Sequence, residues 1–183
     1  SSRTSKDSAG QSRELFLTLQ KPQRDAIRTL LLQGMAAPSV VAQPSLRNKV
    51  GDAVAEIARQ YTDEQVYNED NTRDTWADLL AALFQASQSP DAGQRETAFR
   101  IFATTPGIIE KQHEEVVLSS FTKGFKDDDV AEVLLYSTAL VGTTNARLAC
   151  LQVRLAAMDA FASFFHSITK KAQVKYYPLI SDI

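Results

Sequence analysis

The sequence has 183 residues, 44% of them hydrophobic, and it carries 20 Lys and Arg against 22 Asp and Glu, a formal net charge of −2. This length fits one domain or a short array of repeats, and the apolar content can supply a core, which excludes a disordered tail. The near balance of charges gives no reason to expect direct nucleic-acid binding or a polybasic membrane contact.

The start of the chain and its single cysteine indicate the cellular compartment of the protein and whether the chain is a fragment. Cys150 cannot form an internal disulfide, and the chain opens without a signal-peptide pattern, so we expect a protein of the cytosol or nucleus. No apolar run reaches about 18 residues, so we expect no membrane insertion. Residues 1–20 begin with the polar run Ser1–Ser8 and lack an initiator Met. They indicate a linker or the remnant of a preceding repeat, and the chain is expected to be a fragment of a longer protein.

Apolar residues recur at helical spacing throughout, and no stretch alternates as a strand would, so the predicted fold class is all-α. A first pair of helices is predicted over 21–61. Its first helix starts near Pro22 and ends before Pro38, and its second runs from about 46 to 60 with Ser45 as N-cap. The residues expected to face the core are Ile27, Leu30, Leu31 and Met35, then Val50, Ala53, Val54, Ile57 and Ala58.

Further pairs are predicted downstream. Residues 62–75 carry a net charge of −4 and indicate an acidic surface loop. A second pair spans 76–105, a third spans 106–167, and 168–183 begin a further repeat. The apolar and aromatic residues expected in the core of these pairs are Trp76, Leu79, Leu80, Leu83, Phe84, Ala98, Phe99, Ile101, Phe102, Val116, Val117, Phe121, Phe125, Phe161 and Phe164.

The second helices of the three pairs can be aligned on Arg47, Arg95 and Arg154. The positions three, six and seven residues after each arginine are apolar and should face the core, since they lie on one side of a helix. These positions are Val50, Ala53 and Val54, then Ala98, Ile101 and Phe102, then Ala157, Ala160 and Phe161.

The spacing of the arginines is uneven. Arg47 and Arg95 are 48 residues apart and Arg95 and Arg154 are 59 apart, whereas HEAT or armadillo repeats are roughly 40–47 residues long. We therefore interpret residues 132–152 as an atypical insertion, either a genuine one or a retained intron. Removing residues 133–152 shortens the second spacing to 39. The apolar residues of the segment have no place in stacked repeats, so a poorly packed loop or stray helix is expected.

Four segments in order carry a resemblance to a known family: Leu46–Arg59, Trp76–Leu80, Arg95–Phe102 and Pro106–Ile109. Together they resemble the importin-β family of nuclear transport receptors (karyopherins), in particular its importin-five, or karyopherin beta three, branch. The resemblance covers about 22–131 and 153–183. It implies a HEAT-repeat, right-handed superhelix of antiparallel helix pairs, with first helices on the convex side and second helices on the concave side.

The resemblance also implies a function. Members of the family bind import cargo, shuttle between cytoplasm and nucleus through nucleoporin contacts, and release cargo when the GTP form of the GTPase Ran binds their first repeats. Most cargo and nucleoporin contacts would involve repeats outside this chain. A HEAT scaffold of another kind, such as a phosphatase regulatory scaffold, is the alternative.

A candidate recognition ridge follows from helix geometry. At 100° per residue, the positions one, five and twelve after each aligned arginine lie roughly opposite the core positions. Polar side chains there would form a solvated face in any such array, and the resemblance makes them a Ran-facing concave ridge. The ridge residues are Asn48, Asp52, Arg59, Glu96, Arg100, Asp159 and His166.

No residue pattern indicates catalysis. His113-Glu114-Glu115 begins like a zinc-protease motif, but Val117 stands where the second histidine is needed. Asp127–Asp129 lacks the glycine and glutamate that complete a calcium loop, so these acids indicate helix capping. His166 is remote in sequence from His113 and indicates a solvated helix end. We therefore expect no enzyme activity, no cofactor and no metal site.

Overall fold

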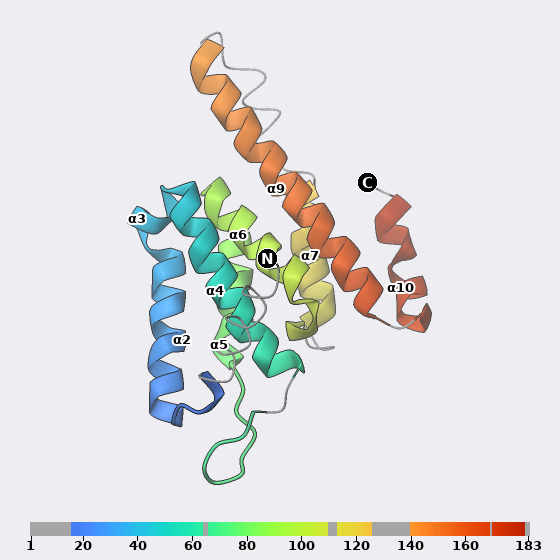
Figure 1. Ribbon diagram of the computed structural model, residues 1–183. Coiled ribbons are helices and arrows are strands. Elements are labelled where there is room, and N and C mark those ends of the chain that lie inside the picture. The colour runs from blue at the N-terminus through green and yellow to red at the C-terminus, as the bar shows by residue number, and fades with distance from the viewer. Residues whose placement is uncertain (1–15, 64–65, 110–112, 126–139, 169, 182–183) are drawn as a thin grey trace, which may run out of the picture.

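The computed structural model describes residues 16–63, 66–109, 113–125, 140–168 and 170–181 (Figure 1). Within these ranges the chain is helical, and its only extended feature is an isolated antiparallel bridge between Tyr67 and Arg73. The prediction of an all-α fold is confirmed. The main elements are α2 (Lys21–Ala36), α3 (Pro38–Val41), α4 (Pro44–Asp63), α5 (Ala77–Ser87), α6 (Ala92–Thr104), the 3-10 turn η1 (Pro106–Ile108), α7 (Glu114–Phe125), α9 (Leu140–Ser167) and α10 (Lys170–Ser181).

The helices form two layers of stacked pairs. Helices α2, α5 and α7 are the first members, and α4, α6 and α9 are the second members that pack on them and on one another (Figure 1). Helix α6 is central, since it contacts α4 on one side and α9 on the other. Its start is well defined, because the Asp91 side chain accepts a hydrogen bond from the backbone N–H of Gln94 at 3.0 Å.

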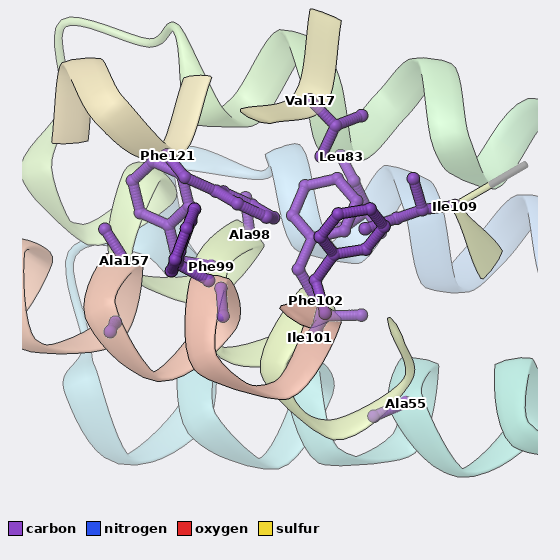
Figure 2. Packing of buried hydrophobic residues seen from close by; sticks show 14 of the residues in the cluster. Ala55, Leu83, Ala98, Phe99, Ile101, Phe102, Ile109, Val117, Phe121 and Ala157 are labelled. Atoms are coloured by element: carbon purple, nitrogen blue, oxygen red, sulfur yellow. The ribbon is translucent and has the colours of Figure 1, made fainter. Parts of the chain in front are cut away.

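The centre of the core is aromatic. Phe99 and Phe102 of α6 meet Phe121 of α7 edge to face, with ring centroids 5.9 and 5.5 Å apart (Figure 2). Ala157 of α9 closes the cluster from the other side. The aligned positions of α6 and α9 are all buried, as predicted: Ala98, Ile101, Phe102, Ala157, Ala160 and Phe161.

Some residues predicted in the core are exposed. Ala53 of α4 is exposed, Leu30 of α2 is 65% exposed and Val116 of α7 is 50% exposed. The buried sides of these helices are narrower than the apolar stripes that periodicity predicts, because each helix buries only the side that faces its partner. Ser45 is also not the N-cap of α4, since that helix begins one residue earlier, at Pro44.

The segment predicted as an acidic surface loop over 62–75 differs from that prediction at its start and at Asp74, whereas Glu69 and Asp70 are exposed. Thr62 and Asp63 still belong to α4, and Asp74 is only 5% exposed. Asp74 accepts hydrogen bonds from Arg24 Nε at 3.0 Å and from Arg28 Nη1 at 3.3 Å. Two buried arginines of α2 therefore anchor the loop, because their charge requires a buried partner.

The residues just before α2 are packed as well. Residues 1–15 of the expected linker lie outside the described residues, but Phe16 is buried and meets the Tyr61 ring edge to face at 6.2 Å. Residues 16–20 are thus part of the folded array rather than linker.

Helix α9 is longer than its counterparts, with 28 residues against 20 in α4 and 13 in α6. Its N-terminal end projects well beyond the other helices (Figure 1). Leu148 and Leu151 in this part are 55% and 56% exposed, whereas Val153 is fully buried. Of the predicted insertion, 132–139 lie outside the described residues, as does Asp127–Asp129. Residues 140–152 are helical and form the start of α9, in which Val153 is the first described side chain that is buried.

Gly124 lies where α7 approaches both α6 and α9. A Cβ atom there would stand 2.8 Å from the Phe99 ring and 2.9 Å from the Ala157 Cβ. We expect Gly124→Ala to lower the free energy of unfolding by about 1–3 kcal/mol, although alanine is the better helix former. Urea denaturation measures the effect. Gly34→Ala is the matched control, since its Cβ would meet Val50 at an ordinary 3.8 Å, and equal effects of the two variants would contradict the close approach.

Candidate functional site: a polar row on the second helices

Three of the predicted ridge residues meet between α4 and α6. Arg100 donates a hydrogen bond to the Oδ1 atom of Asn48, and its Nη2 atom lies 3.3 Å from Asp52 Oδ1. The side chains of Asp52 and Arg100 are 72% and 40% exposed. They form a polar cluster that links two consecutive repeats and still presents both charges to solvent.

Two other ridge residues have partners that the sequence did not indicate. Glu96 of α6 is held by Arg47 of α4, with Arg47 Nη2 2.8 Å from Glu96 Oε2 and both side chains mostly buried. Arg59 pairs with Glu56 on its own helix at 3.3 Å. Glu96 therefore contributes mainly to the α4–α6 contact, and Arg59 is less available to a partner than predicted.

The ridge residues of α9 lie apart from this cluster. Asp159 is exposed on α9, and His166 is exposed near the end of the helix with its Nδ1 atom 2.7 Å from the carbonyl oxygen of Ala162. In the described part of the chain, neither residue forms a hydrogen bond or ion pair with α6. The residues of the predicted ridge are thus joined by contacts between α4 and α6, whereas on α9 they are separate exposed groups. We call these ridge residues the polar row.

A hollow of about 550 Å³ lies on a different part of the array, between the end of α4, the start of α5 and η1. Trp76 lines it beside Tyr61, with ring centroids 6.4 Å apart. Trp76 is only partly buried, so it is less central to the core than predicted. Burial raises the pKa of Tyr61 to about 12, although the positive charge of Arg28 opposes the shift.

The polar row suits recognition of a charged protein surface. Asn48, Asp52, Glu96 and Arg100 are held by contacts between α4 and α6. The charges alternate in sign along these two helices, which favours an electrostatically complementary partner. Among the described residues, no group of three or more His, Cys, Asp or Glu side chains could hold a metal ion. No helix in the described part of the chain is long and apolar enough to cross a membrane.

The fold is an array of HEAT-type helix pairs, in which each pair is stabilised by stacking on its neighbours. A family model described as "IPO5-like, TPR repeats" matches residues 42–144, which is more than half of the chain. The chain belongs to the importin-β family, in its IPO5-like group.

Two known proteins are similar to this chain over most of its length. It is 27% identical over 157 residues to importin subunit beta-3 of Saccharomyces cerevisiae, covering 86% of this chain and 11% of the relative. It is also similar to a crystal structure of a Kap121p mutant, with a TM-score of 0.61 and 26% identity, covering 94% of this chain and 14% of that one. The chain thus spans about a tenth to a seventh of the length of these relatives. The predicted right-handed HEAT superhelix agrees with this neighbour.

Proposed function

We propose that this chain is an early segment of a nuclear import receptor and that its second helices contribute to binding Ran in the GTP form. Membership of the importin-β family supports the class of function. The observation that carries the specific proposal is the Asn48–Arg100–Asp52 cluster, because it presents both signs of charge on two consecutive second helices. The segment acts by binding and has no chemistry of its own.

The remaining roles belong to the receptor as a whole. Import cargo would bind the extended array, and nucleoporins would contact repeats mostly outside these residues, so that the receptor shuttles between cytoplasm and nucleus. Neither role involves nucleic acid or membrane insertion. A phosphatase regulatory scaffold, the alternative, has no observation in its favour beyond the shared architecture. Preference for Ran-GTP over Ran-GDP separates the two, since only the receptor should show it.

A charge swap tests the ridge. Asp52→Lys, Arg100→Glu and Asp159→Lys, combined in one variant, keep an opposite-charge pair between α4 and α6 while reversing the charges offered to a partner. We expect binding of Ran-GTP by the 183-residue chain to be weak, because the chain spans only 11% of its relative. We expect the swap to weaken it at least about tenfold, since like charges across an interface are costly. Calorimetry at low salt with Ran-GTP and Ran-GDP measures both affinities.

The control swap uses an exposed pair elsewhere on the array. Lys175 of α10 and Glu115 of α7 lie 2.6 Å apart, and both side chains are more than half exposed. Lys175→Glu with Glu115→Lys should leave Ran-GTP affinity unchanged. If both swaps leave the affinity unchanged, the ridge assignment is wrong. If the chain does not prefer Ran-GTP to Ran-GDP, the proposed Ran binding by this segment is wrong.

A further inference from the structure

The arginine that starts the second helix has the same structural role in the first two pairs. Arg47 donates from Nη1 to the carbonyl oxygen of Val41, six residues earlier, at 2.9 Å. Arg95 donates from Nη1 to the carbonyl oxygens of Ser89 and Pro90, six and five residues earlier, both at 2.9 Å. Each arginine thus satisfies carbonyl groups of the turn between the two helices of its pair.

Arg154, the third member of this set, cannot have that role in the present chain. It is exposed in the middle of α9, fourteen residues after the helix begins at Leu140. The residues five and six positions before it, Ala149 and Leu148, are themselves helical. Carbonyl groups inside a helix already accept intrahelical hydrogen bonds, so no turn lies within reach.

The part of α9 before Val153 is also unlike the rest of the helix. From Val153 onwards, residues at helical spacing are buried against α6 and α7: Val153, Ala156, Ala157, Ala160 and Phe164. Before Val153, none of the described side chains is buried, and the helix projects past its neighbours (Figure 1). The exposure of Leu148 and Leu151 continues after Val153 in Leu155 and Met158, so these four residues form one exposed face of α9. Among the described side chains of α9, Val153 is therefore the first that is buried.

Direct joining of Glu132 to Val153 restores the pattern of the other two pairs. Arg154 then stands six residues after Asp128 and five after Asp129, in register with Arg95 after Ser89 and Pro90. The sequence Asp129-Val130-Ala131-Glu132 has the acceptor and the glutamate of a capping box, immediately before the apolar positions that begin at Val153. The repeat length and the position of the arginine after the turn thus agree with one junction, whereas the capping residue Asp129 would stand five residues before Arg154 and Asp91 stands four before Arg95.

We propose that residues 133–152 are the translation of an unspliced intron and that the working protein joins Glu132 directly to Val153. The segment is twenty residues long, so sixty nucleotides encode it and the reading frame survives on both sides. Codons for Val133 begin with GT and Gln152 can be encoded by CAG, which fit the two ends of an intron. Thr144-Asn145 can be encoded with CTAAC, a branch-site sequence. The inference does not depend on the proposed Ran binding.

Peptide mass spectrometry of the protein from its native cells tests the junction. Trypsin cleaves after Lys126, and the joined protein yields a peptide of Asp127–Glu132 followed by Val153 and Arg154. The unjoined protein yields Asp127–Arg147 instead. We expect the joined peptide, together with a transcript sixty nucleotides shorter than the genomic sequence. Detection of Asp127–Arg147 at an amount comparable to or above that of the joined peptide would overturn the proposal.

Substitution of Arg154 gives an independent test on purified protein. In the joined chain, Arg154→Ala should lower the melting temperature by about 2–4 °C, since it removes a hydrogen bond to the turn. In the 183-residue chain the same substitution should change it by less than about 1 °C. Arg95→Ala is the control, because its contacts are present in both chains. Equal effects of Arg154→Ala in the two chains would contradict the proposed register.

Discussion

Replacing Phe102 by alanine is expected to lower the free energy of unfolding by about 3–5 kcal/mol. The side chain is fully buried, and it packs against Phe121 in the cluster that joins α6, α7 and α9. Truncation removes a ring and leaves a cavity that neighbours on three helices fill only partly. Urea denaturation, monitored by circular dichroism, measures the loss.

Two further variants test whether the loss of stability comes from the buried volume of the Phe102 ring. Phe102→Leu should cost less, because it retains most of the apolar volume. Leu30→Ala removes an apolar side chain that is 65% exposed and should change stability by at most about 0.5 kcal/mol. If Phe102→Ala behaves like Leu30→Ala, the proposed packing of α6 against α7 is incorrect.

Replacing Asp74 by asparagine is expected to lower the free energy of unfolding by a similar amount, about 3–5 kcal/mol. The side chains of Asp74, Arg24 and Arg28 are all less than 8% exposed. Loss of this carboxylate leaves the buried guanidinium of Arg24 without a charged partner and leaves that of Arg28 with only the half-exposed Asp25, which costs more than the ion pair contributes. Asp159→Asn, at an exposed position of α9, is the matched control and should be nearly neutral.

The dependence of stability on pH distinguishes the buried cluster of Asp74, Arg24 and Arg28 from apolar packing, because only an ionisable group makes stability change with pH. Burial alone would raise the pKa of Asp74, but the charge of Arg28 and the hydrogen bonds from Arg24 and Arg28 outweigh it and hold the pKa below its ordinary value of 3.8. Because the folded-state pKa is lowered, the contribution is complete above the unfolded-state value and is lost as pH falls through the folded-state value. Urea unfolding below about pH 4 should therefore show a shallower acid loss for Asp74→Asn than for the wild-type chain. Parallel curves would contradict the buried pairing.

The sequence predicted the central repeats well and the first one less well. In α6 and in α9 from Val153, small and aromatic residues recur at one helical spacing, so the buried side could be assigned from periodicity alone. In α2 the most deeply buried side chains include Arg24 and Arg28. Their partner Asp74 lies about fifty residues later in a loop, and no local pattern indicates a pair so far apart. The same holds for the link between Arg47 and Glu96.

The candidate ridge shows a similar limit. Helix geometry placed its residues on the second helices, but it treated them as equivalent outward groups. The structure instead joins Arg100 to Asn48 and Asp52, and it leaves Asp159 and His166 as exposed groups on α9. Distances between repeats depend on how the helices stack, which the spacing within one helix does not specify.

The two contacts that α6 makes along the array differ in how much exposed charge they include, although apolar residues of α4, α6 and α9 belong to one buried cluster. The joint with α4 is linked by Arg47–Glu96 and by Arg100–Asp52, of which the second pair is open to solvent and therefore screened by salt. The joint with α9 rests on close aromatic and alanine packing, which salt hardly affects. Raising the ionic strength should consequently weaken the α4–α6 contact more than the α6–α9 contact, so that a salt-dependent change in the curvature of the array should begin between α4 and α6.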